Sequence, residues 1–264
     1  MKTYVINLDR AVDRWTRVAA LLDNTGIRYE RVSAVVGKEL QLPIAEFDEQ
    51  KYRWFHGKRP NLGQIGCFLS HFNSLKLFLQ TQDTLAMICE DDITPVADLQ
   101  SILDRAIERR DLWDILRLSG FHDSHPRKVC ELTDSYTLSV NMTRLCGTGC
   151  YLVNRKAAEV LIEKMLPMRV PIDHALDREW FYGLRALGVD PLPVRQNPDE
   201  LPSSLPQTRN EKLPIWKRYW GVFPYRAYNE ATRLVSRTKL LRETRQRFSE
   251  RSSCASQTSC VLDH

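Results

Sequence analysis

The segment Leu85-Ala86-Met87-Ile88-Cys89-Glu90-Asp91-Asp92 decides the fold of this chain and points to its chemistry. Five largely apolar residues run directly into three acids, and an apolar run of this length with polar borders predicts a buried strand. Ligands of open α/β sheets bind outside the carboxyl ends of the strands, so the acids are expected where a ligand would lie. A divalent cation would relieve the repulsion among the three carboxylates. The alternative is a solvated acidic turn that merely ends the strand.

The segments around this strand alternate between strand and helix patterns. Strands are predicted at 3–8, 29–36, 85–92, 113–118, around 136–140, and at 151–153 and 189–194, and helices at 12–22, 63–80, 96–110, 155–166 and 173–187. Residues 38–60 predict a loop with a short helix. The β-α-β opening favours a parallel sheet with right-handed crossovers, so the predicted fold class is α/β, with a mostly parallel sheet flanked by helices. A dinucleotide-binding motif is excluded, because Gly147-Thr148-Gly149 lacks the full glycine spacing and precedes a strand.

The length of 264 residues fits one large domain, or one domain with an appendage. No apolar run approaches the roughly 20 residues that span a bilayer. The N-terminal residues do not resemble a signal peptide, because charged Asp9 and Arg10 interrupt the first apolar run. The seven cysteines are odd in number and include no CxxC pair, which favours free thiols in a reducing compartment over a disulfide framework or a zinc site.

Positive charge gathers near the C-terminus. Residues 209–251 hold 12 Lys and Arg against 4 Asp and Glu, a balance of +8, whereas the whole chain carries +5 and the remainder therefore −3. Aromatic residues from Trp216 to Tyr225 interleave with cations, a pattern typical of a membrane interface. We predict a main domain at 1–200, a basic aromatic helical extension at 201–251 that contacts an anionic membrane surface or the acceptor, and a disordered tail at 252–264. Residues 196–214, rich in proline, predict a linker or flexible loop.

Four segments together resemble glycosyltransferase family 25, the lipopolysaccharide (lipooligosaccharide) biosynthesis transferases. They are Val5-Ile6-Asn7-Leu8-Asp9-Arg10 with Asp13-Arg14-Trp15, Gly63 to His71, Glu90-Asp91-Asp92, and Gly147 to Val153 leading to Lys156-Ala157-Ala158. The resemblance covers residues 1 to about 200. It implies a GT-A-like (Rossmann-like) fold, a UDP-sugar donor that is usually UDP-galactose, a divalent metal (Mn²⁺ or Mg²⁺), and inversion at the anomeric carbon.

The resemblance also implies roles for the first three segments. Donor-binding residues are predicted at Asn7, Leu8, Asp9, Arg10, Arg14, Ser70, His71 and Glu90. Arginines suit the diphosphate because they donate forked hydrogen bonds, although Arg14 could instead pair with Asp9 or Asp13 on a helix surface. A buried structural histidine is the alternative for His71. Glu90 and Asp92 leave the strand on the same side and are the predicted metal ligands.

An inverting transferase needs a general base for the acceptor hydroxyl. Asp173 is predicted for this role because Pro171-Ile172-Asp173 resembles the family's segment before its last helix, and a helix N-cap is the alternative. Asp91 of the acidic motif is the second predicted catalytic residue. His174, His122 and His125 are candidates for a further metal ligand, and His174 is the one we assign. The acceptor is predicted to contact Gly147, Thr148 and Gly149, for which a simple strand kink is the alternative.

The predicted function is metal-dependent transfer of galactose from UDP-galactose to a sugar of the lipopolysaccharide or lipooligosaccharide core, on the cytoplasmic face of a bacterial inner membrane. Glucosyl transfer and a protein-linked acceptor such as hydroxylysine are alternatives within the family. A non-catalytic nucleic-acid-binding protein that uses the basic extension is the alternative from another class. We do not expect nucleic acid as a partner, because nucleic-acid binding would leave the acidic motif unexplained. A transferase fold that binds sugar nucleotide without turnover is a further alternative.

Overall fold

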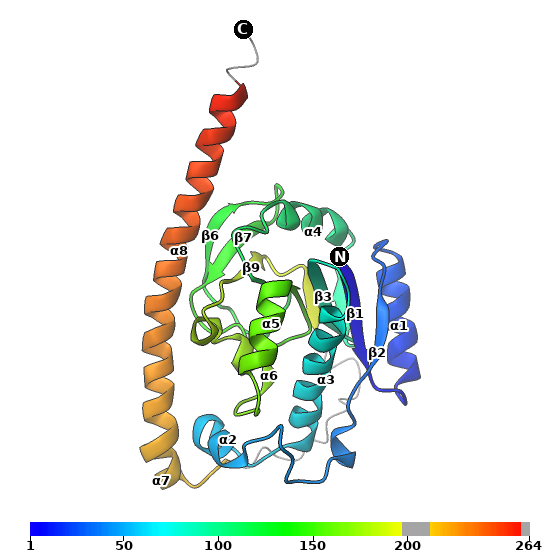
Figure 1. The fold of residues 1–264 in the computed structure, drawn as a ribbon, viewed down its shortest axis with the longest axis vertical. Coiled ribbons are helices and arrows are strands. Elements are labelled where there is room, and N and C mark those ends of the chain that lie inside the picture. The colour runs from blue at the N-terminus through cyan, green and yellow to red at the C-terminus, as the bar shows by residue number, and fades with distance from the viewer. Residues whose placement is uncertain (197–211, 260–264) are drawn as a thin grey trace.

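The computed structural model describes residues 1–196 and 212–259 (Figure 1). In chain order its elements are β1 (Lys2–Asn7), α1 (Val12–Asp23), β2 (Glu30–Ser33), η1 (Gly37–Glu39), α2 (Glu49–His56), α3 (Leu62–Leu79), β3 (Leu85–Glu90), β4 (Ile93–Pro95), α4 (Leu99–Glu108), β5 (Ile115–Arg117), β6 (Pro126–Glu131), β7 (Thr137–Asn141), β8 (Cys150–Asn154), α5 (Arg155–Lys164), α6 (Ile172–Leu176), η2 (Glu179–Tyr182), β9 (Ala186–Asp190), β10 (Val194–Gln196), α7 (Ile215–Lys217), η3 (Arg218–Val222) and α8 (Phe223–Ser259). The predicted linker at 196–214 lies largely outside the described residues.

One eight-stranded sheet, in the order β2-β1-β3-β8-β5-β9-β7-β6, forms the centre of the molecule. Strands β7 and β8 are antiparallel to their neighbours, and the other six strands share one direction. The prediction of an α/β fold with a mostly parallel sheet is therefore confirmed. Strands β4 and β10 form a separate antiparallel pair beside the carboxyl end of β3.

Helices cover both faces of this sheet, and β3 is buried on both sides. Its residues alternate between two hydrophobic clusters: Met87 and Cys89 pack with residues of α1 and α4, whereas Ala86 and Ile88 pack with residues of α3 and α5. Burial on both faces explains why the sequence of this strand is a continuous apolar run instead of an alternating one.

The region 173–187 differs from its prediction as one long helix. The structure divides this region into α6, η2 and β9. Gly183 follows η2 and adopts a left-handed φ of +68° before β9 begins. Leu187 and Val189 belong to the central sheet, so the predicted last strand at 189–194 begins earlier and ends at Asp190. The apolar residues of this region satisfied a helical pattern, but a short strand between buried neighbours requires only a few such residues.

The C-terminal helix α8 lies along the side of the body that carries β6 and β7 and continues beyond it (Figure 1). It includes residues 252–259, where the sequence predicts a disordered tail, and that part of the domain division stays a prediction; residues 260–264 lie outside the described part of the chain. The predicted boundary between a main domain and an extension at residue 200 stays a prediction. No helix in the described ranges has both the length and the apolar character needed to cross a bilayer.

Candidate active site

The carboxyl ends of β1 and β3 meet through Asn7, Arg14 and Asp91. The Asn7 amide donates to Asp91 Oδ2 at 2.6 Å, and the Arg14 guanidinium forms an ion pair with Asp91. Asp91 is buried. These contacts fix the first strand, the first helix and the acidic motif relative to one another. These two partners occupy the carboxylate of Asp91, and a catalytic role for this residue stays a prediction.

The remaining predicted donor residues of the first loop lie at the surface next to Arg31. Arg31 donates to Asn7 Oδ1 through Nε at 2.9 Å and Nη2 at 2.6 Å, and it pairs with Asp9 at 3.3 Å. Arg10 is exposed and Leu8 is half-buried in the same turn. This arrangement places guanidinium groups at the strand end, where a nucleotide would meet them, whereas the buried Asn7 amide is already bonded to Asp91 and Arg31. Sequence reasoning missed Arg31, because nothing in its local pattern links it to Asn7.

Glu90 lies at the centre of a hydrogen-bonded chain that begins at Tyr151. His71 Nε2 is 3.3 Å from Glu90 Oε1, and His71 Nδ1 is 3.2 Å from the Tyr151 hydroxyl, so the imidazole can donate to Glu90 while it accepts from Tyr151. Thr148 Oγ1 donates to Glu90 Oε1 at 2.8 Å. Burial by itself raises the pKa of Glu90, but the hydrogen bonds from His71 and Thr148 outweigh burial and lower the pKa. Glu90 is therefore held as a carboxylate.

Asp92 has a different environment. Burial, together with the nearby negative charge of Glu90, raises the pKa of Asp92 to about 7. Its Oδ1 is buried and has no hydrogen-bond partner among the described residues. A buried carboxylate oxygen without a partner beside a second carboxylate is suited to a hard cation.

Ser70 and Cys67 flank His71 on helix α3. Ser70 Oγ donates to the Gly66 carbonyl at 2.7 Å and accepts from the Val35 amide at 2.8 Å, so it anchors the loop after β2. One ligand atom each of Cys67, His71 and Glu90 lie within 4.8 Å of one another. Burial raises the pKa of the Cys67 thiol well above its ordinary value, so this cysteine is a poor metal ligand. The alternative reading of His71 as a buried, hydrogen-bonded histidine fits its position, although its bond to Glu90 also connects it to the acidic motif.

The glycine segment before β8 lies beneath the side chain of Gln196. A Cβ at Gly149 would come within 2.3 Å of the Gln196 side chain, and Gly147 adopts a left-handed φ of +69°. Thr148 is buried against Glu90. The close approach that these glycines permit is therefore made by Gln196 of the chain itself, and contact with an acceptor stays a prediction.

A buried ion pair holds the same segment from behind. Arg117 Nη1 lies 3.1 Å from Asp177 Oδ1, and Arg117 Nη2 donates to the Cys146 carbonyl at 3.1 Å and to the Gly147 carbonyl. Asp177 Oδ2 accepts from the amides of Leu145 at 3.0 Å and Cys146 at 2.8 Å. Arg117 and Asp177 thus set the backbone that presents Thr148 to Glu90. No local sequence pattern predicts this ion pair, because 60 residues separate its members.

Asp173 and His174 lie on helix α6. Pro171 occupies the N-cap of α6, so the alternative that Asp173 caps this helix is wrong. Ligand atoms of Asp173, His174 and Cys146 lie within 4.8 Å of one another, and the His56 ring packs edge-on against His174 with 5.2 Å between centroids. Burial lowers the pKa of His174, which favours the neutral imidazole. The ligand atom of His174 lies near that of Asp173, whereas the ligand atom of Glu90 lies near that of His71. A metal site that His174 and Glu90 share stays a prediction. His122 and His125 are exposed on the loop before β6.

Among solved structures, the chain resembles a Drosophila β-1,4-galactosyltransferase 7 variant in complex with manganese, UDP-Gal and xylobiose, with 12% identity, a TM-score of 0.34 and coverage of 83% of this chain and 72% of that chain. A galactosyltransferase in complex with donor and acceptor sugar analogues gives 15% identity, a TM-score of 0.33 and coverage of 62% of each chain. Because these TM-scores and sequence identities are low, the family of the chain is assigned from the sequence comparisons.

The sequence comparisons identify relatives in animals. The chain is 32% identical over 215 residues to procollagen galactosyltransferase 1-B of Xenopus laevis, covering 72% of this chain and 35% of that protein. It is 34% identical over 99 residues to a glycosyltransferase 25 family member of Drosophila melanogaster, covering 35% of this chain and 16% of that protein. The chain therefore spans about a sixth to a third of the length of these relatives. The sequence profile described as glycosyltransferase family 25 (LPS biosynthesis protein) matches residues 1–176, and the chain belongs to this family.

Proposed function

We propose that this chain is an inverting galactosyltransferase that uses UDP-galactose. The observation that carries the proposal is the acidic motif at the end of β3, where Glu90 is held ionised and Asp92 keeps a buried oxygen without a partner among the described residues. Asn7 of the first strand and Arg14 of α1 bind this motif, and we propose that Arg10 of the turn after β1 and Arg31 of β2 contact the diphosphate. The galactosyltransferase names of the Xenopus relatives support galactose as the transferred sugar.

The residues present fit a divalent cation, for which we propose Mn²⁺ or Mg²⁺. Asp92 Oδ1 is the available ligand and Glu90 lies beside it. His174 is the proposed third ligand; its ligand atom groups with those of Cys146 and Asp173, and not with those of Glu90 or Asp92. Bound there, the cation would neutralise charge on the departing diphosphate. A cation would also favour the ionised form of Asp92, which the protein alone disfavours.

Asp173 is the proposed general base. An acceptor hydroxyl attacks the anomeric carbon, Asp173 takes the hydroxyl proton, and UDP leaves from the opposite face with the electron pair of the broken bond. Asp173 lies in the first turn of α6, and its charge is felt at Cys67, which neighbours the Glu90 network. The charges of Asp173, Glu90 and Asp92 all raise the pKa of the Cys67 thiol, which favours a position of Asp173 near the acidic motif.

The acceptor we propose is a sugar of the lipopolysaccharide or lipooligosaccharide core, in a bacterial cell. The description of the matching family supports this choice, whereas the animal relatives support a protein-linked acceptor or an origin outside bacteria. Transfer assays with a lipid-free core oligosaccharide and with a hydroxylysine peptide distinguish the two acceptors.

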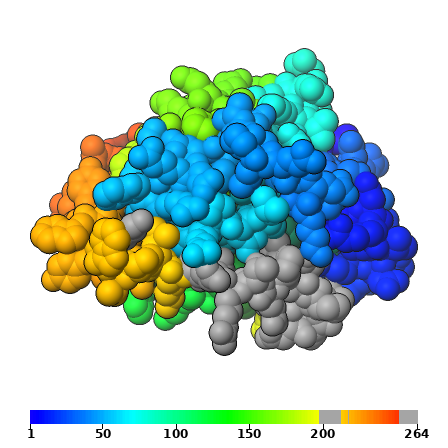
Figure 2. Space-filling view, turned by 90° about the horizontal axis from the view of Figure 1, so that it is seen from below, coloured from blue at the N-terminus to red at the C-terminus, as the bar shows by residue number. Residues whose placement is uncertain are grey.

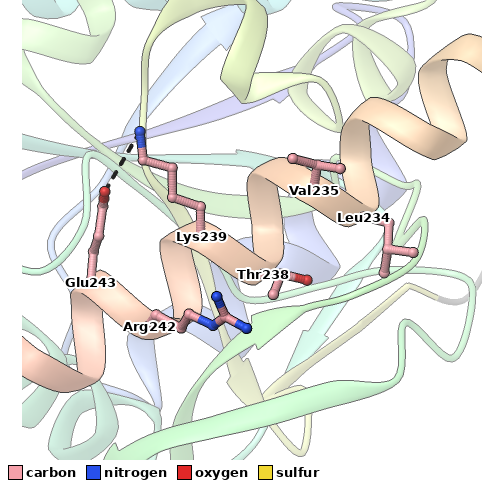
Figure 3. A pocket seen from close by; sticks show the side chains of 6 residues that line it. All are labelled: Leu234, Val235, Thr238, Lys239, Arg242 and Glu243. Atoms are coloured by element: carbon pink, nitrogen blue, oxygen red, sulfur yellow. Dashed lines mark ion pairs between the residues drawn. The ribbon is translucent and has the colours of Figure 1, made fainter.

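We propose that helix α8 contacts the cytoplasmic face of an anionic membrane. Figure 3 shows its outer side, where Leu234 and Val235, exposed by 58% and 70%, precede Lys239 and Arg242 along the helix. Apolar residues beside cations suit the surface of an anionic bilayer. Replacing Lys239 and Arg242 by glutamine is expected to weaken binding to anionic vesicles and not to neutral ones. Equal loss on both would contradict the electrostatic part of this proposal.

A thermal-stability assay tests the proposed function. UDP-galactose with Mn²⁺ is expected to raise the melting temperature more than UDP-glucose or GDP-mannose does, since a ligand at about 100 times its Kd stabilises the native state by about 2.7 kcal/mol. Asp173→Asn should keep this stabilisation and lose turnover, because it removes the base and leaves the donor site intact. If no sugar nucleotide stabilises the protein in the presence of metal, the proposed function is wrong. A steep salt dependence of RNA binding would then favour the nucleic-acid-binding alternative.

A further inference from the structure

A hollow lined by three tryptophans lies between α2 and the segment α7–η3. Its volume is about 270 Å³, and Gln50, Arg53, Trp54, Leu213, Trp216 and Trp220 line it. Figure 2 shows the face on which residues 215–225, in orange, lie against the α2 region, in light blue. The candidate active-site residues described above do not line this hollow.

Contacts around the hollow fix the relative positions of its two walls. Trp54 packs on Gly221, where a Cβ would come within 2.4 Å of the indole. Phe55 and Tyr225 stack with 4.3 Å between ring centroids. The amide of Leu213 donates to the Gly57 carbonyl at 3.1 Å. Trp54 is thus held by packing, and the two walls that carry the tryptophans are fixed relative to each other, which lowers the entropy cost of binding a ligand between them.

The lining is aromatic, partly polar and close to electrically neutral. Trp54, Trp216 and Trp220 are exposed by 54%, 61% and 79%. The Arg53 guanidinium is paired with Glu49, with Nε at 2.9 Å from its carboxylate, so it contributes little net charge. A sugar ring matches this chemistry, because its C–H faces pack on indoles while its hydroxyls reach an amide or a guanidinium at the rim. A lipid phosphate would instead favour unpaired cations.

Helix α2 connects the hollow to the candidate active site. Its inner side carries Tyr52 and His56, which are buried, and His56 packs against His174. Its outer side carries Trp54. The hollow and His174 therefore contact different sides of the same helix.

We propose that this hollow binds a neutral sugar unit of an oligosaccharide acceptor, at a distance from the sugar that reacts. The inference rests on the proposed function and makes it more specific: the acceptor is a glycan of several sugars, and the tryptophans select for its length. A peptide-linked hydroxylysine without attached sugar would leave the hollow unused.

The probe is the lipid-free core oligosaccharide of a lipooligosaccharide, titrated against the full chain while tryptophan fluorescence and heat are measured. The oligosaccharide is expected to bind and to change the fluorescence. Trp220→Ala is expected to weaken binding by at least about tenfold, and Trp220→Phe to weaken it less because an aromatic face remains. The matched control is Tyr228→Ala, which removes an aromatic residue exposed by 57% that does not line the hollow.

Three outcomes overturn this inference: no binding of the oligosaccharide, equal binding by Trp220→Ala, or equal losses in Trp220→Ala and Tyr228→Ala. If vesicles of phosphatidylethanolamine and phosphatidylglycerol change the fluorescence while the oligosaccharide does not, the hollow is a lipid contact and the inference is wrong. Stabilisation by UDP-galactose, measured separately on the wild type and Trp220→Ala, is expected to be equal in both. If UDP-galactose does not stabilise the wild type, the proposed function is contradicted, and the oligosaccharide titration alone decides whether the hollow binds sugar.

Discussion

At the scale of single residues, three consecutive acids meet three different environments. Asp91 binds Asn7 and Arg14, Glu90 accepts from His71 and Thr148, and Asp92 keeps one oxygen without a described partner. The strand β3 ends at Glu90, and Asp91 and Asp92 form the turn before β4, so the predicted strand 85–92 is two residues too long and the alternation of a strand does not extend to Asp92. The middle acid therefore assembles the site, and the outer two are available for a cation.

Replacing Asp92 by asparagine is expected to abolish Mn²⁺ binding in the presence of UDP while leaving the fold intact. The reason is that Asp92 has the free oxygen, and that its raised pKa already favours the uncharged form in the absence of metal. Isothermal calorimetry measures the affinity directly. The control is Asp98→Asn, an exposed acid a few residues away. Unchanged Mn²⁺ affinity in Asp92→Asn would remove this residue from the metal site.

Asp177→Asn is expected to destabilise the protein at neutral pH by about 3–5 kcal/mol, because it leaves the buried Arg117 without its counter-charge. Burial alone raises the pKa of Asp177, but Arg117 and Arg237 outweigh burial and lower the pKa below the ordinary 3.8. A carboxyl with a lowered folded pKa stabilises the fold fully above pH 3.8, and this contribution is lost as the pH falls below that value.

Denaturant unfolding at several pH values checks this expectation. The wild type should lose stability on acidification below the ordinary aspartate range, and the Asp177→Asn variant should show a flatter acid limb. Asp134→Asn, at an exposed position, is the control. Equal pH dependence of the wild type and Asp177→Asn would show that the ion pair contributes nothing to acid stability.

At the scale of elements, helix α3 depends on one close backbone contact. A Cβ at Gly66 would lie 2.7 Å from the Val35 carbonyl oxygen and 2.9 Å from the Gly37 nitrogen. Ser70, one turn later, binds the Val35 amide. The helix thus approaches the loop after β2 closely enough that only glycine fits at position 66.

We expect Gly66→Ala to destabilise the protein by about 1–3 kcal/mol, since two backbone segments would have to separate. Asn73→Ala, at an exposed position of the same helix, should leave stability nearly unchanged or raise it slightly because alanine is the better helix former. Urea denaturation of both variants gives the comparison. A Gly66→Ala protein as stable as the wild type would mean that the loop after β2 moves at little cost.

The elements that the sequence predicted correctly are those with a long, regular pattern. Helix α3 and strand β3 follow their predictions because each buries many apolar residues at one spacing. The division of 173–187 into three elements could not be predicted, since Asp177 turns the chain through an ion pair with Arg117 that is distant in sequence. The acidic motif was visible as a run of carboxylates. The residues that surround it come from other elements and have no local signature: Arg31 binds Asn7, Tyr151 binds His71, and Gln196 lies over Gly149.

At the scale of the whole molecule, α8 is joined to the body by a buried bidentate ion pair. Arg237 Nε and Nη2 each lie 3.0 Å from a Glu179 carboxylate oxygen, and Arg237 also donates to the Thr143 carbonyl at 2.8 Å. Arg233 is buried next to it. Part of the positive charge that the sequence assigns to an extension in contact with a membrane or the acceptor therefore lies inside the protein.

Arg237→Met is expected to cost about 3–5 kcal/mol, because Glu179 would remain buried without its partner. Adding Glu179→Leu should recover much of this loss, since an apolar pair can replace a buried ion pair. Arg242→Met, at an exposed position of the same helix, is the control. Chemical denaturation distinguishes the three variants, and a double variant no better than Arg237→Met would contradict the pairing.

The match to the family profile ends at residue 176, immediately before Asp177. Asp177 neutralises Arg117 inside the sheet, and Glu179 receives the arginine of the last helix. Recombination between relatives at this point in the gene would therefore separate Arg117 from Asp177, whereas Glu179 and Arg237 would stay together on the C-terminal side. We expect the segments on the two sides of residue 176 to be inherited together, and swaps between homologues to succeed only where Arg117 and Asp177 are transferred as a pair.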